Sequence, residues 1–176
     1  MAYQVSADAD IIAQQLPADE SFPNNPTLPL LLYRQAVRSD DSDAAAAFEQ
    51  LFHDNGWRGS WRNGVFSYHH YHPNAHEVLG VCAGEARIQF GGPDGPILEI
   101  AAGDVAILPA GAAHKNIDSD AAFEVVGAYP AGQTDYETLR GEPNERPRAE
   151  QRIAQVPLPA ADPVYGKNGP LLDYWY

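Results

Sequence analysis

Apolar and polar residues alternate along much of the chain from residue 57 to about residue 132. In residues 85–90, Ala86, Ile88 and Phe90 share one face and polar residues share the other, as in a half-buried strand. Similar short runs, separated by turns rich in glycine and proline, cover residues 65–72, 77–82, 97–100, 104–109 and 122–129. Many short strands at this spacing predict an all-β sandwich or barrel.

A helical period precedes the predicted strands. Phe48, Leu51 and Phe52 fall at i, i+3 and i+4, which predicts a helix over residues 43–54 with an apolar stripe that packs on the barrel. Ser42 or Asp43 can cap its start, and the acidic stretch 39–42 complements the positive end of the helix dipole. Asn55-Gly56 is a typical stop signal.

The two ends of the chain lack either period. Prolines 17, 23, 26 and 29 favour extended conformations over residues 10–17 and 28–37. Residues 140–163 are rich in proline and charge and predict an extended surface segment. The apolar residues 170–176 are expected to pack on the barrel or on a partner subunit.

Without an internal repeat, residues 1–176 are predicted to form one domain. In this division, residues 1–59 form an arm and helix, residues about 60–132 the barrel core, and residues 133–176 an extended tail. The apolar residues of the two ends also predict a homodimer.

Charge narrows the classes of partner. The 24 acidic and 11 basic residues give a net charge of −13, which repels nucleic acid and anionic lipid. Polyanionic ligands are disfavoured as well, unless a metal or the nearby Arg58, Arg62 and Arg87 compensates. We therefore expect a small-molecule ligand, no nucleic acid and no membrane.

The single cysteine, Cys82, excludes an intrachain disulfide and is expected to be a small buried apolar group. The first residues carry no basic region and no long apolar stretch, so no signal peptide is expected. Together these features predict a cytoplasmic protein.

Three histidines and one glutamate are spaced like a set of metal ligands. His70 and His72 are two residues apart, so on a strand they point to one side. Glu77 has the opposite parity, so Pro73-Asn74 must interrupt the strand before it. Residues 109–111 form a turn that presents His114 from another strand. Three imidazoles and one carboxylate can hold a divalent metal and leave positions open.

The residues around these four match two short signatures. Gly64, His70, His72, Glu77 and Gly84 fit the pattern G-x5-H-x-H-x3,4-E-x6-G. Gly103, Pro109, Gly111 and His114 fit G-x5-P-x-G-x2-H-x3-N, except that Asp118 replaces the final Asn. The chain thus resembles cupins over about residues 60–130. The strings HHYHPNAHEVLGV, HKN and GAYPAGQ resemble a group of single-domain bacterial cupins called YjlB-like.

This resemblance implies a cupin double-stranded β-helix, the RmlC-like jelly-roll barrel, with one N-terminal helix and extended arms. It also implies a metal held by His70, His72, Glu77 and His114. Residues expected to line the pocket are Asn116, Tyr129 and Trp61. His69 differs in parity from its neighbour His70, and His76 from its neighbour Glu77, so both are expected at the surface or an interface.

The ligand set suits iron, manganese, nickel, cobalt, copper or zinc. The leading hypothesis is a small metalloenzyme that chelates a small oxygen-bearing metabolite, with an oxygenase-type reaction as the first specific guess. Two alternatives remain open: an isomerase- or epimerase-like cupin, and a non-catalytic cupin that binds a small ligand. The catalytic residues and the substrate are unknown.

Overall fold

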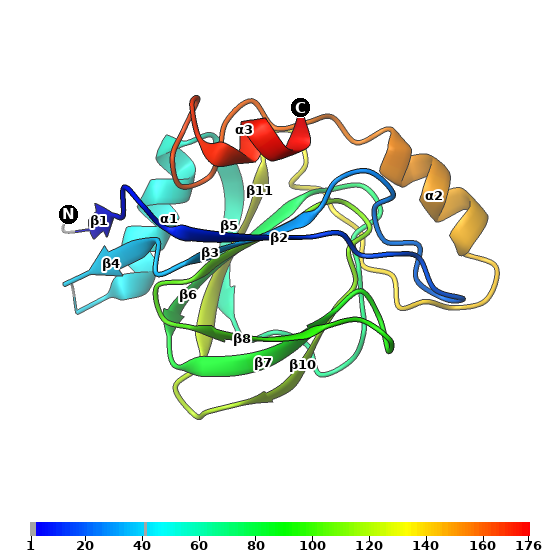
Figure 1. The fold of residues 1–176 in the computed structure, drawn as a ribbon, viewed down its shortest axis with the longest axis horizontal. Coiled ribbons are helices and arrows are strands. Elements are labelled where there is room, and N and C mark those ends of the chain that lie inside the picture. The colour runs from blue at the N-terminus through cyan, green and yellow to red at the C-terminus, as the bar shows by residue number, and fades with distance from the viewer. Residues whose placement is uncertain (1–2, 41) are drawn as a thin grey trace.

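Two antiparallel sheets face each other across an apolar interior, in a computed structural model that describes residues 3–40 and 42–176. The larger sheet has the order β2 (Asp10–Gln14), β3 (Leu30–Arg34), β9 (Val105–Leu108), β6 (Glu77–Ala83), β11 (Glu124–Pro130) and β5 (Trp57–Asn63). The smaller sheet has the order β10 (His114–Ser119), β7 (Glu85–Phe90) and β8 (Ile97–Ala101). Figure 1 shows the smaller sheet on the opposite side of the barrel from α1 (Ala44–Asp54) and α3 (Pro170–Trp175).

The barrel interior follows from period-two alternation. Ala86, Ile88 and Phe90 of β7 are buried while their polar neighbours point out, which confirms the predicted strand. Leu79 of β6 and Val125 of β11 join them in one cluster that lies between the two sheets.

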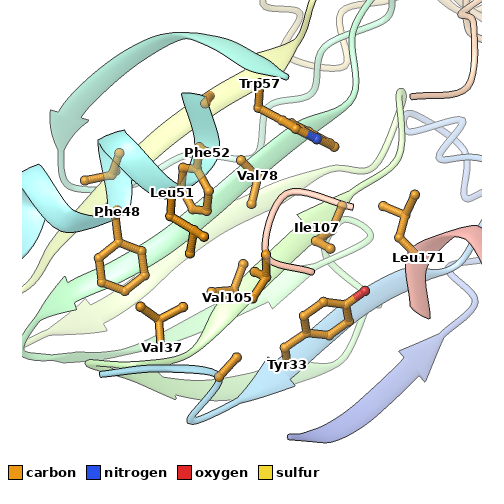
Figure 2. Close-up of a cluster of buried hydrophobic side chains, with 14 of the residues drawn as sticks. Tyr33, Val37, Phe48, Leu51, Phe52, Trp57, Val78, Val105, Ile107 and Leu171 are labelled. Carbon is orange, nitrogen blue, oxygen red and sulfur yellow. The ribbon is translucent and has the colours of Figure 1, made fainter. Parts of the chain in front are cut away.

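The outer face of the larger sheet carries a second core (Figure 2). Phe48, Leu51 and Phe52 of α1 are buried there, as the helical period predicts. A side chain at Gly80 would place its Cβ 2.3 Å from the Phe48 ring, so glycine lets α1 approach the sheet closely. Asp43 caps the helix by accepting a hydrogen bond from the backbone N–H of Ala46 at 3.2 Å. Asp41, part of the predicted acidic stretch, lies outside the described residues.

The N-terminal arm is extended, as predicted, and is tied to the barrel. It supplies β2 and β3 to the larger sheet, and β1 (Tyr3–Val5) pairs with β4 (Val37–Ser39). Buried Asn24 donates to the carbonyl of Gly91 and accepts from the N–H of Ala113, both at 3.0 Å. The arm therefore braces the turn that precedes His114.

The tail differs from the extended conformation expected for residues 140–163, because α2 (Arg146–Ala154) forms within it. Pro147 stands in the first turn, where a helix has no need of its N–H group. Ala149 and Ile153, four residues apart, are buried against Phe22 and Tyr71. The prediction from proline and charge content overlooked this short apolar stripe.

The end of the chain packs on the barrel, as expected. Leu171 and Trp175 of α3 are buried in the outer core, and Figure 2 shows Leu171 beside Tyr33 and Ile107. The Trp175 indole donates to the carbonyl of Pro29 at 2.9 Å.

No helix in residues 3–40 and 42–176 is long and apolar enough to cross a membrane.

Candidate metal centre

Direct backbone pairing brings the two histidine-bearing segments together. His70 and His114 face each other in an antiparallel bridge, with N–H···O distances of 3.2 and 2.9 Å. Their ring centroids are 4.0 Å apart, and the His72 ring is 6.0 Å from each. One nitrogen from each of the three rings lies within 4.8 Å of the other two, so the three buried imidazoles could hold one metal ion.

Two breaks in the chain create this convergence, as the parity of the residues predicts. Residues 73 and 74 form a bend, and β6 begins only at Glu77. The Asn74 side chain holds the bend by bonding backbone groups of Asp135 and Glu137 at 3.0 and 2.9 Å. In the second break, Gly111 has φ +91° and donates its N–H to the carbonyl of His72 at 2.8 Å.

Hydrogen bonds to backbone carbonyls orient all three rings. Nδ1 of His70 lies 3.0 Å from the carbonyl of Tyr68, and Nδ1 of His114 lies 3.1 Å from that of Ala112. Nδ1 of His72 lies 2.8 Å from the carbonyl of Glu137. A carbonyl can only accept, so each Nδ1 carries a proton, and a ring with no second proton then presents the lone pair of its Nε2. That is the tautomer a metal ligand needs.

Glu77 closes the group from β6. Its side chain is almost fully buried, with Oε2 3.3 Å from Nε2 of His72 and Oε1 3.2 Å from Nε2 of His114. Oε2 also accepts a hydrogen bond from the Tyr129 hydroxyl at 2.8 Å. Oε1 has no well-formed hydrogen bond among the described residues, although it is buried. A buried carboxylate oxygen without such a bond, 3.2 Å from Nε2 of His114, fits a cation at this point.

The electrostatics of the four groups are those of a carboxylate among imidazoles. Burial opposes charge on Glu77, but His72 and His114 outweigh it and lower the pKa of the carboxyl below its ordinary value. Burial likewise opposes charge on His72, but Glu77 raises the pKa of that imidazole. Burial, together with His114, lowers the pKa of His70 to about 3, so its ring is neutral and able to bind a metal near neutral pH.

The four groups lie in the wall of a cavity of about 300 Å³. The predicted pocket residues Trp61 and Tyr129 line it, and the Trp61 indole donates to the Tyr129 hydroxyl at 2.8 Å. Asn116 is outside the lining; it lies on β10 and donates to the Ser119 hydroxyl at 3.1 Å. Residues that line the cavity are Trp61, Arg62, Asn63, Gly64, Val65, Phe66, His70, His72, Glu77, Leu79, His114, Tyr129, Tyr136 and Thr138.

The sequence analysis missed several of these lining residues, among them Phe66, Tyr136 and Thr138. Phe66 has the parity of His70 and His72, so the alternation that grouped the histidines could also have found it. Tyr136 and Thr138 belong to a segment without regular period, and only the fold brings them to the cavity.

The neighbouring histidines stay out of the cavity lining, but the expectation of surface exposure is wrong for His76. That side chain is buried, its Nδ1 accepts from the N–H of Ala110 at 2.8 Å, and its ring lies 4.8 Å from that of Trp175. Its parity does direct it to the other face of the sheet, but α3 covers that face. His69 is half-buried, with its ring 5.5 Å from Phe22.

The departure from the second signature at position 118 lies away from the cavity. Asp118 follows a register shift in β10 and forms an ion pair with Arg87 at 2.6 Å, where both side chains are exposed. Asp118 therefore takes no part in the cavity that His114 lines.

Two sequence comparisons match this chain to known proteins. A family model described as Cupin matches residues 60–138. The protein YjlB of Bacillus subtilis strain 168, described as uncharacterised, is 45% identical over 159 residues, which are 90% of this chain and 93% of that protein.

Solved structures are more distant. An uncharacterised conserved protein with a double-stranded β-helix domain from Klebsiella pneumoniae has a TM-score of 0.38 and 14% identity, covering 79% of this chain and 89% of the other. Acireductone dioxygenase from Bacillus anthracis, with a cadmium ion in its active centre, has a TM-score of 0.38 and 16% identity, covering 51% of this chain and 60% of that enzyme. Pumpkin seed globulin has a TM-score of 0.37 and 24% identity over 45% of this chain, which spans only 22% of that protein.

Proposed function

Because this chain belongs to the cupin family, we propose that it is a metalloprotein that binds one divalent transition metal through His70, His72, Glu77 and His114. The observation that carries the proposal is the common orientation of the three imidazoles. Each has its Nδ1 bound to a backbone carbonyl and its Nε2 left to ligate.

The donor set restricts the metal. Imidazole nitrogen with one carboxylate suits iron, manganese, nickel, cobalt, copper or zinc, whereas magnesium and calcium prefer sites made of oxygen ligands. Four protein ligands leave one or two coordination positions, and the cavity gives a small molecule access to them.

We further propose that the protein is a small metalloenzyme acting on a small oxygen-bearing molecule, with an oxygenase-type reaction as the first to test. The metal would supply a Lewis acid or, if redox-active, a platform for dioxygen. The chain itself would supply the shape of the site and orient Glu77: aromatic side chains line the cavity, and the Tyr129 hydroxyl donates its proton to that carboxylate.

The lining favours this reading over the isomerase or epimerase alternative. Such chemistry needs a general base close to the substrate. Apart from the four proposed ligands, the described residues that line the cavity include no carboxylate and no imidazole.

Metal content tests the first part of the proposal. We expect about one equivalent of metal per chain by elemental analysis of protein made in its natural host, and a sharp loss in His72→Ala and His114→Ala. His53→Ala is a matched control, because His53 is exposed on α1 and should leave the stoichiometry unchanged. Unchanged metal content in both site variants would refute the ligand assignment.

Oxygen uptake tests the second part. Protein loaded anaerobically with Fe(II) and exposed to oxygen with small diols, keto acids and thiols should consume oxygen with at least one of these classes. His72→Ala should abolish that uptake. If no class supports uptake, the protein is better described as a non-catalytic cupin that binds a small ligand.

A further inference from the structure

Exposed aromatic rings gather at the cavity. Six large apolar side chains are exposed in the part of the chain that the structure describes, and two of them, Phe66 and Tyr136, line this one cavity. Phe66 is 49% exposed and Tyr136 is 38% exposed, although exposing an apolar ring to water is unfavourable. Apolar side chains exposed together in a concave site are typical of ligand binding.

Both rings are held in place by other rings next to the histidines. Phe66 stacks on Tyr68, with centroids 4.9 Å apart and an interplanar angle of 11°, and its edge meets His70 at 5.0 Å. Tyr136 stacks on Tyr129 at 4.2 Å and 24°. The two exposed rings are therefore ordered surfaces close to the proposed metal.

Other lining residues add apolar surface to the cavity. Val65 and Leu79 contribute aliphatic side chains, and Trp61 contributes an indole whose N–H is already bonded to Tyr129. A ligand that packs here gains contact area and few hydrogen bonds.

Cationic groups are nearly absent from the lining. Arg62 is the one lysine or arginine among the described lining residues, and its guanidinium is bonded to Glu49 and Asp43. Sites that recognise phosphate usually turn a free guanidinium or several N–H donors toward it. Arg62 has already committed its donors to two carboxylates.

We propose that the cavity takes a small molecule with one planar apolar ring and a short oxygen-bearing head that carries no phosphate. The head faces the proposed metal, and the ring packs against Phe66 and Tyr136. A volume of about 300 Å³, near the lower end for small-molecule sites, matches a ligand of that size. This inference rests on the proposed function, because the metal fixes the end of the cavity to which the head binds.

Two hydroxamates that share a head and differ in the ring provide the test. The full chain is loaded with Co(II), and its visible absorption is followed during titration with acetohydroxamate and, separately, with benzohydroxamate. Burial of the phenyl ring should make benzohydroxamate bind at least about tenfold more tightly. Equal dissociation constants would overturn the proposal, as would a change of the cobalt spectrum by submillimolar inorganic phosphate.

Variants of the cavity residues test where the phenyl ring of benzohydroxamate binds. In Phe66→Ala and Tyr136→Ala, the ratio of the two dissociation constants should fall toward one. Tyr174→Ala is the matched control, since Tyr174 is 44% exposed but lies outside the cavity lining, and it should keep the full ratio. A ratio that stays unchanged in both cavity variants would contradict the assigned position of the ring.

A second readout separates this inference from the metal proposal. If the chain binds no cobalt, the proposed function fails. Saturation-transfer NMR on the metal-free chain then reports ring binding by itself. Saturation of the benzohydroxamate ring protons that disappears in Phe66→Ala supports the ring site, and no saturation in the wild-type chain refutes it.

Discussion

The Tyr129 hydroxyl lies between Trp61 and Glu77, accepting a hydrogen bond from the indole and donating one to the carboxylate, both at 2.8 Å. Burial, with the charge of Glu77 beside it, raises the pKa of Tyr129 above its ordinary value, so the phenol keeps its proton. It can therefore donate to Oε2 and leave Oε1 of Glu77 on the side of His114. We expect Tyr129 to position Glu77 without touching the metal.

Tyr129→Phe should keep the fold and weaken metal binding by about tenfold, the lower end of the range for removing a group that orients a ligand. Competition with a chromophoric chelator measures the affinity. Tyr165→Phe is the control, since it removes a hydroxyl that bonds the Ser6 carbonyl at 2.6 Å and is not part of the cavity lining. Equal metal affinities in the two variants would show that the Tyr129 hydroxyl does not position Glu77.

His76 should make the stability of the metal-free protein depend on pH. Burial lowers the pKa of His76 from 6.5 to about 4, against the smaller effect of the Pro157 carbonyl. Between these values the unfolded chain binds the extra proton, so the free energy of unfolding falls as pH drops from above 6.5 toward 4. The loss from this one group is on the order of 3 kcal/mol.

Urea unfolding of His76→Gln at several pH values checks this. The variant should lose less stability than the wild type between pH 6.5 and 4, whatever its stability at neutral pH. His53→Gln, at an exposed position, should follow the wild-type curve. Parallel curves for wild type and His76→Gln would contradict the assigned protonation.

Among the elements, those with a regular period could be predicted from the sequence. Alternation places Ile88 and Phe90 inside the barrel, and the helical stripe of Phe48 and Phe52 gives α1 within one residue of its observed start. The break before Glu77 also followed from parity, since a continuous strand would turn that carboxylate away from His70 and His72.

Elements held by distant contacts could not be predicted in this way. The helix α2 depends on Phe22 and Tyr71, which lie far away in the sequence, and its own composition is polar. Tyr136 reaches the cavity because Asn74 holds the backbone on either side of it. Local sequence pattern does not contain such contacts. It therefore identified the four candidate ligands, which the structure brings together, but missed part of the cavity wall.

A substitution at Gly80 tests the contact between α1 and β6. Gly80→Ala would put a methyl group 2.3 Å from the Phe48 ring, and forcing the helix outward should destabilise the protein by about 1–3 kcal/mol. Gly64→Ala is the matched control, because a Cβ there meets nothing within 4 Å. Thermal unfolding compares them, and equal melting temperatures would mean that α1 packs less closely on the sheet than described.

For the whole molecule, oligomeric state stays a prediction. Leu171 and Trp175, two of the apolar tail residues that favoured a dimer, are buried on their own barrel, while Tyr174 and Tyr176 are exposed. We still expect a homodimer, so light scattering should give twice the chain mass of 19.1 kDa. A mass of one chain at all concentrations would refute it.

The net charge of the whole molecule also affects which ligands can bind. The net charge of −13 repels anions over the whole surface, and the cavity adds little positive charge to offset it because Arg62 is paired with Glu49 and Asp43. A site that still binds an oxygen-bearing head then depends on the metal. The predicted cytoplasmic location and the absence of nucleic-acid and membrane partners stay predictions.

The most direct test of the account is a crystal of the metal-loaded protein measured at the absorption edge of that metal. We predict that the strongest anomalous peak lies about 2.1 Å from Nε2 of His70, His72 and His114, with Oε1 of Glu77 at a similar distance. A peak bound to other side chains, or no peak in protein that carries one equivalent of metal, would contradict the central claim.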